Sequence, residues 1–244
     1  MVSPIQILHE VSSPNYEERK VGESLDKIII HYTGMIDTFS ALKRLCSRNA
    51  RVSAHFLIDG KGKIWQLVSE EKVSWHAGIS SWQNKTNLNY SSLGIELCNP
   101  GHDYGYLKFP EKQISSLESL LSKLIDKYNI RTESILGHSD IAPSRKKDPG
   151  EKFPWKRLAD KGLAAWTENK EDLPKTYIKR ELIYKSLKDI GYNVQNYYND
   201  SIIAFKRHFI QSNLDSEISN EELKNYWLFQ VILKKFAVVL DFVD

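Results

Sequence analysis

Three consecutive isoleucines, Ile28 to Ile30, stand in the run Lys27–Thr33 near the start of the chain. A short apolar run of β-branched residues predicts a strand buried inside a sheet. Two further runs, Ala54–Ile58 and Ile64–Val68, are separated by a turn that begins with Asp-Gly and predict a hairpin. Leu93–Cys98 is a fourth candidate strand, closed by Asn-Pro-Gly.

Helical spacing lies between these strands. Thr38–Arg48 and Glu111–Tyr128 both repeat their apolar residues at helical intervals, and the second carries one continuous stripe from Ile114 to Ile125. Hydrophobic residues make up 41% of the 244 residues, enough for a sizeable core. Because strands and helices interleave, we expect an α/β fold with a central mixed β-sheet flanked by helices.

The sequence changes character at Glu168–Pro174 and becomes helical. Three apolar stripes follow, which predict a small C-terminal three-helix domain: Leu182, Leu187 and Ile190; Ile203, Phe205 and Phe209; Leu223, Trp227 and Val231. We therefore predict two domains, 1–170 and 171–244. The apolar segment Trp227–Leu240 is too short for a membrane span and is interrupted by two lysines, so no transmembrane segment is expected.

The charge pattern excludes some partners. The net charge is only +3, with 34 Lys and Arg dispersed among 31 Asp and Glu, which argues against nucleic acid as a partner. Residues 1–170 hold 24 basic and 20 acidic side chains, an excess that favours an anionic ligand for that part. Two cysteines, Cys46 and Cys98, support neither a disulfide scaffold nor a cysteine zinc cluster, and we expect buried thiols.

A loop dense in ionisable groups follows the strand-like Ser134–Leu136. His138 and Asp148 lie ten residues apart in it and can both reach one divalent ion, and His31 at the end of the first strand supplies a second imidazole. Two histidines and one carboxylate, with a fourth position open, have the composition of a catalytic zinc site. The alternative is that a strand-end histidine such as His31 only makes structural hydrogen bonds.

Two further charged residues are candidates for chemistry. Glu96 stands in an apolar strand, and its neighbours Ile95 and Leu97 point to the opposite face. It is either a residue of a polar sheet face or a general base whose pKa is raised by burial. Lys146 could place a positive charge where an oxyanion develops, although the run Arg145–Lys147 alone suggests a solvated loop lysine.

These motifs occur in a familiar order. The segments IIIHYT, VSAHFLID, SWHAGISSW, SLGIEL and HSDIAPSRKKDPG resemble the zinc-dependent N-acetylmuramoyl-L-alanine amidases of the AmpD/AmiD type, from about Ile5 to Trp166. That family shares the type-2 amidase fold with peptidoglycan recognition proteins and phage T7 lysozyme.

The resemblance implies a function and a set of roles. The chain would hydrolyse the amide between N-acetylmuramic acid, intact or in its 1,6-anhydro form, and L-alanine, in cell-wall turnover or recycling. The implied zinc ligands are His31, His138 and Asp148, one zinc per chain, with Glu96 as acid/base and Lys146 as transition-state stabiliser.

Other residues of the same motifs are candidates for binding peptidoglycan or muropeptide substrate: Tyr32, His55, Trp75, His76 and Asn89. For His55 and His76 a structural role is the alternative, and Trp75, Trp82 and Phe56 are expected as apolar groove walls or core. Two other functions compete with catalysis. A non-catalytic recognition module would not need the three ligands, Glu96 and Lys146 together. A structural zinc site normally has four protein ligands.

Three features bear on specificity and location. Related amidases usually carry an arginine where Asn87 stands, and Tyr90 replaces an Asp, which puts recognition of a stem-peptide carboxylate in doubt unless Lys85 substitutes. The segments Leu187–Tyr192 and Ile202–Phe209 resemble the small peptidoglycan-binding domain that follows the amidase domain in the AmiD group, or else form a helical cap. A wall-binding domain favours the periplasm or cell envelope; the cytoplasm is the alternative, because no signal peptide is visible.

Overall fold

The computed structural model describes residues 6–20, 22–166, 180–212 and 214–215. A six-stranded sheet forms its centre, in the order β1-β5-β4-β9-β3-β10. The strands are β1 (Ile7–Leu8), β5 (Ile64–Gln66), β4 (Phe56–Ile58), β9 (Ser92–Leu97), β3 (Lys27–Tyr32) and β10 (Ile135–Gly137). Only β4 and β5 pair antiparallel, as the predicted hairpin, so the sheet is mixed as expected.

Two small ribbons and several helices complete the part of the chain up to Trp166. The ribbons are β2 (Tyr16–Glu18) with β6 (Lys72–Ser74), and β7 (Ser81–Trp82) with β8 (Lys85–Thr86). The helices are α1 (Thr38–Leu45), α2 (Glu111–Tyr128), α3 (His138–Ile141) and α4 (Trp155–Asp160). The extent of α2 was predicted correctly. Helix α1 ends three residues earlier than expected, and a 3-10 turn at Arg48–Ala50 follows it.

The two faces of the sheet have different covers. Ile28, Ile30 and Ile95 point to one face and pack with the apolar stripe of α2. Ile29, between the first two, points to the other face and packs with Leu136. The consecutive isoleucines are thus buried on both sides of a central strand, as their pattern predicts.

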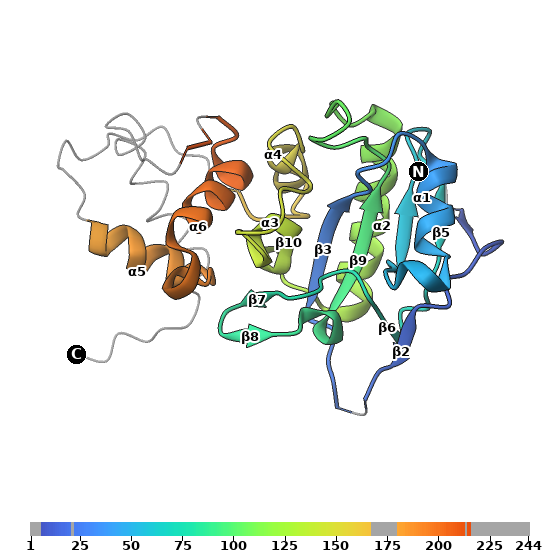
Figure 1. The fold of residues 1–244 in the computed structure, drawn as a ribbon, viewed down its shortest axis with the longest axis horizontal. Coiled ribbons are helices and arrows are strands. Elements are labelled where there is room, and N and C mark those ends of the chain that lie inside the picture. Colours follow the sequence, from blue (N-terminus) through green and yellow to red (C-terminus); the bar gives the residue numbers. More distant parts are fainter. Residues whose placement is uncertain (1–5, 21, 167–179, 213, 216–244) are drawn as a thin grey trace.

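The second face is covered by α1 at one end and by C-terminal helices at the other. Helices α5 (Arg180–Ile190) and α6 (Val194–Phe209) lie beside α3 at the β10 edge (Figure 1). Their apolar residues form one buried cluster with Ile29 and Leu136 of the sheet: Ile183, Leu187, Ile190, Tyr192, Val194, Ile202, Ala204, Phe205 and Phe209. Ile202, rather than the expected Ile203, is fully buried on α6.

The contact between the two parts is close and partly polar. Gly191, with a φ of 138°, lies against the Trp82 ring, where a Cβ would approach a ring carbon to 2.6 Å. Asp140 of α3 is 1% exposed and accepts hydrogen bonds from Tyr192 Oη and His208 Nδ1, each at 2.7 Å. The predicted third helix and the boundary at residue 170 lie outside the described residues, so the division into 1–170 and 171–244 stays a prediction.

Candidate metal centre and active-site groove

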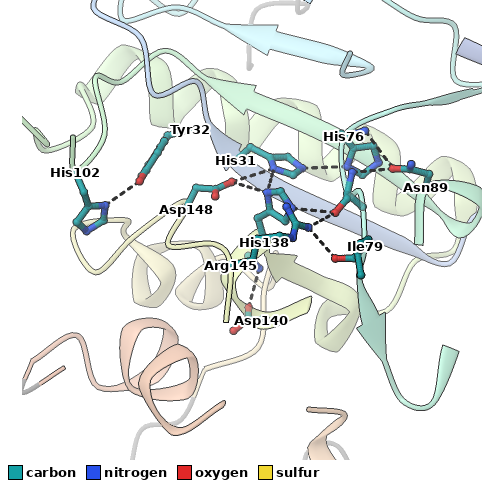
Figure 2. Close-up of polar contacts among 12 residues, drawn as sticks. His31, Tyr32, His76, Ile79, Asn89, His102, His138, Asp140, Arg145 and Asp148 are labelled. Carbon is teal, nitrogen blue, oxygen red and sulfur yellow. Dashed lines mark hydrogen bonds and ion pairs between the residues drawn. The ribbon is translucent and has the colours of Figure 1, made fainter. Parts of the chain in front are cut away.

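Three donor atoms from distant parts of the sequence converge on one point. His31 Nδ1 lies 2.9 Å from His138 Nδ1 and 3.0 Å from Asp148 Oδ2, and His138 Nδ1 lies 3.0 Å from the same carboxylate oxygen. All three side chains are buried. Figure 2 shows the two rings and the carboxylate turned toward one another, so the predicted ligand set is brought together.

The sheet explains why these residues meet. Strands β3 and β10 are parallel neighbours, with Ile30 opposite Gly137, so His31 and His138 follow at adjacent strand ends. Asp148 is returned to them by its loop, since its carbonyl accepts a hydrogen bond from the Ser139 N–H at 2.9 Å. The site therefore lies outside the carboxyl ends of parallel strands, the usual position in α/β sheets.

The hydrogen bonds around the rings show that this set fits a cation. His138 Nε2 lies 3.1 Å from the Ala77 carbonyl, which can only accept, so the ring proton is on Nε2 and Nδ1 presents a lone pair. Burial opposes ionisation of Asp148, but the contacts with His138 and His31 outweigh it and hold its pKa well below its usual range. Burial, with His138 nearby, lowers the pKa of His31 to about 4. A carboxylate and two imidazoles that face one another form a ligand set for a divalent ion.

Glu96 lies beside this centre, opposite His31 in the register of β9 and β3 and on the same face. Its neighbours Ile95 and Leu97 pack in the α2 core on the other face, as expected. Its Oε2 has no accessible surface and no hydrogen-bond partner among the described residues. Burial raises the pKa of Glu96 to about 8, with Asp148 adding to the rise and Lys146 opposing it. A bound divalent cation would also oppose it.

A groove of about 490 Å³ opens over these residues. Four cations line it, Arg44, Arg145, Lys146 and Lys147, and the acidic lining residues are Glu96, Asp103 and Asp148. Lys146 is thus a groove residue and not a remote loop lysine. Arg44 had no signal in the sequence, because it stands in the last turn of an ordinary amphipathic helix.

The predicted substrate contacts divide into two groups. Tyr32, Trp75 and His76 line the groove. His55 does not, since it is fully buried and its Nδ1 accepts from the Gly94 N–H at 3.0 Å. Asn89 does not line it either; its Oδ1 accepts from the backbone N–H groups of residues 76 and 77. Contact of His55 or Asn89 with substrate therefore has no support in this geometry.

Two of the expected apolar wall residues, and the residues considered for binding the stem-peptide carboxylate, lie outside the groove. Phe56 and Trp82 are buried in the core. Lys85 lies on β8, outside the groove lining, and forms an ion pair with Asp26 at 3.0 Å, so it does not replace the arginine of related amidases. Tyr90 donates its hydroxyl to Glu17. Cys46 and Cys98 are free thiols but only half-buried, which corrects the expectation of full burial.

Comparison with known proteins assigns the family. The family model described as N-acetylmuramoyl-L-alanine amidase matches residues 21–151. The chain belongs to the N-acetylmuramoyl-L-alanine amidase family. It is 36% identical to the amidase AmiD of Escherichia coli K12 over 80% of this chain and 78% of AmiD. It is also 36% identical to the 1,6-anhydro-N-acetylmuramyl-L-alanine amidase AmpD of the same organism, over 61% of this chain and 88% of AmpD.

Solved structures of amidases in this family agree with the fold. AmiD from E. coli in complex with anhydro-N-acetylmuramic acid-L-Ala-D-gamma-Glu-L-Lys matches with a TM-score of 0.75 and 30% identity, covering 91% of this chain and 98% of AmiD. AmpDH3 from Pseudomonas aeruginosa in complex with anhydromuramic pentapeptide matches with a TM-score of 0.76 and 26% identity, covering 93% and 99%. The type-2 amidase fold expected from the motifs is therefore confirmed.

Proposed function

We propose that this amidase hydrolyses the amide between the lactyl group of N-acetylmuramic acid and the L-alanine of the stem peptide, with one zinc ion per chain. The observation that carries the proposal is the convergence of three donors within 3.0 Å beside the unpartnered carboxylate oxygen of Glu96. Two nitrogens and one oxygen, all from side chains, leave a fourth position open, as catalytic zinc requires. When bound, zinc supplies Lewis acidity that polarises the scissile carbonyl and makes water a stronger acid.

The neighbouring side chains supply the proton transfer. Glu96, on the same face as His31, accepts the proton of the attacking water and passes it to the nitrogen that leaves. The Oε2 atom, which has no hydrogen-bond partner among the described residues, is free to take part in both transfers. Lys146 lines the same groove and stabilises the negative charge that develops on the carbonyl oxygen. Proton transfer and stabilisation of the oxyanion are thus each assigned to one residue of the groove that contains the metal centre.

The groove suits an anionic muropeptide. Stem peptides carry carboxylates, and Arg44, Arg145 and Lys147 add positive charge to the lining at positions other than that of the arginine found in related amidases. AmiD and AmpDH3 are solved with anhydromuramyl peptides bound. These findings support a muropeptide substrate for this chain.

Mass spectrometry of the products tests the proposal. The zinc-loaded protein is incubated with a soluble anhydromuropeptide and, separately, with intact sacculi, each with and without a chelator. Release of free stem peptide from either substrate, abolished by the chelator and restored by zinc, is the expected result. Intact muropeptide after prolonged incubation with the zinc-loaded protein would contradict the proposal. The ratio of the two activities reports whether soluble muropeptide or polymeric wall is the better substrate.

For the helical domain, the contacts of Tyr192 and His208 with Asp140 support a structural role. Binding of polymeric wall by residues 171–244, and with it a location in the periplasm or cell envelope rather than the cytoplasm, stays a prediction. Cosedimentation of the full chain with insoluble peptidoglycan tests the binding, and cell fractionation tests the location. No helix among the described residues is long and apolar enough to cross a bilayer.

A further inference from the structure

His76 follows β6 and lies against the metal centre without being part of it. Its ring is 8% exposed, and its Nδ1 is 3.0 Å from the Nε2 of His31, the nitrogen that faces away from His138 and Asp148. On the other side, His76 Nε2 lies 3.2 Å from Ser92 Oγ. Figure 2 shows the His76 ring in line behind His31.

The bond that Ser92 makes at the far end of this row of hydrogen bonds fixes which atom donates in each of the others. Ser92 Oγ donates to the Leu88 carbonyl at 2.5 Å, and a carbonyl can only accept. Ser92 Oγ must then accept from His76 Nε2–H, which leaves His76 Nδ1 without a proton. That atom accepts from His31 Nε2–H, so the lone pair of His31 is on Nδ1, directed at the metal centre.

We propose that His76 is a positioning residue that fixes the tautomer and ring orientation of the metal ligand His31. The inference rests on the proposed metal site and deepens it. A ligand histidine normally donates its second ring N–H to a carboxylate, a carbonyl or water. Here the acceptor is a neutral imidazole, so it orients His31 without adding negative charge to the centre, where Asp148 is the one anionic donor of the set. The cation therefore keeps more of its Lewis acidity.

The local fold holds His76 rigidly in this position. Asn89 Oδ1 accepts from the N–H groups of His76 and Ala77, at 3.1 and 2.7 Å. The ring lies on the surface of Gly94, where a Cβ would approach His76 Cγ to 2.4 Å. A side chain at position 94 would displace the ring.

Two consecutive residues hold both imidazole ligands. His76 takes the outer N–H of His31 through its ring, and Ala77 takes that of His138 through its carbonyl, at 3.1 Å. Arg145 donates to the same carbonyl at 2.8 Å. This segment, His76-Ala77, thus orients both imidazole ligands. Asn89 contributes indirectly, because it holds the backbone of the segment.

Substitutions at position 76 test the role of its acceptor atom. His76→Phe keeps an aromatic ring but removes the acceptor, and we expect zinc affinity, measured by competition with a chelating dye, to fall by about 10–100-fold. His76→Asn places an amide oxygen near the position of Nδ1 and should restore affinity to within a few-fold of wild type. Loading with Co²⁺ gives absorption bands that report coordination geometry, and these should change in His76→Phe and return in His76→Asn.

A matched pair of serine variants tests the proton direction. Ser92→Ala releases His76 Nε2, whereas Ser74→Ala removes a hydroxyl that lies 2.8 Å from His55 Nδ1 and makes no described hydrogen bond to His76 or His31. Both should lower thermal stability, but only Ser92→Ala should weaken zinc binding. This pair decides the matter even if His76→Phe does not fold.

The outcomes separate this inference from the proposed function. If the wild-type chain binds neither zinc nor cobalt, the proposed metal site fails. If the wild type binds zinc, and His76→Phe and Ser92→Ala bind it as tightly with an unchanged cobalt spectrum, the positioning role alone is overturned. Equal loss in folded His76→Phe and His76→Asn would also overturn it, because the acceptor atom would then not be the cause.

Discussion

Tyr192→Phe should destabilise the whole protein, although it removes a single oxygen atom from a residue that does not line the groove. Tyr192 is 2% exposed and donates to Asp140 Oδ1 at 2.7 Å, while Asp140 Oδ2 accepts from His208 and from the Gly137 N–H. Asp140 is 1% exposed, so water cannot replace the lost donor. Burial and the charge of Asp140 raise the pKa of Tyr192, which keeps the phenol a donor at any ordinary pH.

The magnitude follows from the charge on the acceptor. A hydrogen bond to a charged group contributes about 1.5–3 kcal/mol. In a chain of this size each kcal/mol lowers the midpoint temperature by about 2–4 °C, so a loss of about 2 kcal/mol lowers it by about 4–8 °C. Because Ile29 of the sheet and Phe205 of α6 share one core cluster, the two parts should unfold in one transition.

Scanning calorimetry of the zinc-loaded protein measures both quantities. The control is Tyr197→Phe on the helix α6 that follows Tyr192, where the side chain is 36% exposed and loss of the hydroxyl should change the stability by less than about 0.5 kcal/mol. If Tyr192→Phe melts like this control, the hydrogen bond to Asp140 contributes nothing. A separate early transition for the helical domain would refute the single shared core.

Other substitutions address the chemistry and the pH dependence. Asp148→Ala should lose stoichiometric zinc by metal analysis, and full occupancy would remove it from the ligand set. Glu96→Gln should retain zinc but lower kcat by about 10²–10⁴-fold, and a near wild-type kcat would require another base. Lys146→Ala should lower kcat by about 10²–10³-fold with a smaller change in KM, whereas an effect on KM alone would make it a substrate contact. Burial lowers the pKa of His55 to about 4, so between about pH 6.5 and pH 4 the unfolded state binds a proton that the folded state does not. The free energy of unfolding should therefore fall as the pH drops through this range. Urea titrations should show a shallower fall for His55→Gln, and an equal fall would exclude His55 as the cause.

The sequence predicts the central sheet and the metal ligands for the same physical reason. Buried strands need continuous apolar runs, and a polar residue at the end of such a run, such as His31, or inside one, such as Glu96, is visible against them. The ordered motifs then assign the roles. The helix Glu111–Tyr128 is equally plain because one face packs on the sheet and the other is solvated.

Contacts made after folding are not visible in the sequence. His55 and His76 stand in similar motifs, yet His55 is bound to Ser74 and the Gly94 N–H, whereas His76 contacts a metal ligand. Nothing in the sequence distinguishes Arg44 from Lys85 as a candidate cation for the site. The fold places Arg44 in the groove and Lys85 in an ion pair with Asp26. Asp140 reads as part of the metal loop, whereas its partners lie more than fifty residues away.

Helix α3 is only four residues long, and its first and third residues, His138 and Asp140, serve different partners. One faces the metal centre and the other is held by Tyr192 and His208. Two equilibria that share so short a rigid element obey reciprocal linkage. If docking of α5 and α6 favours the position of His138 that binds the ion, binding of the ion must favour docking by the same free energy. The coupling free energy between metal loading and the docking of α5 and α6 is therefore one quantity, which can be measured from either equilibrium.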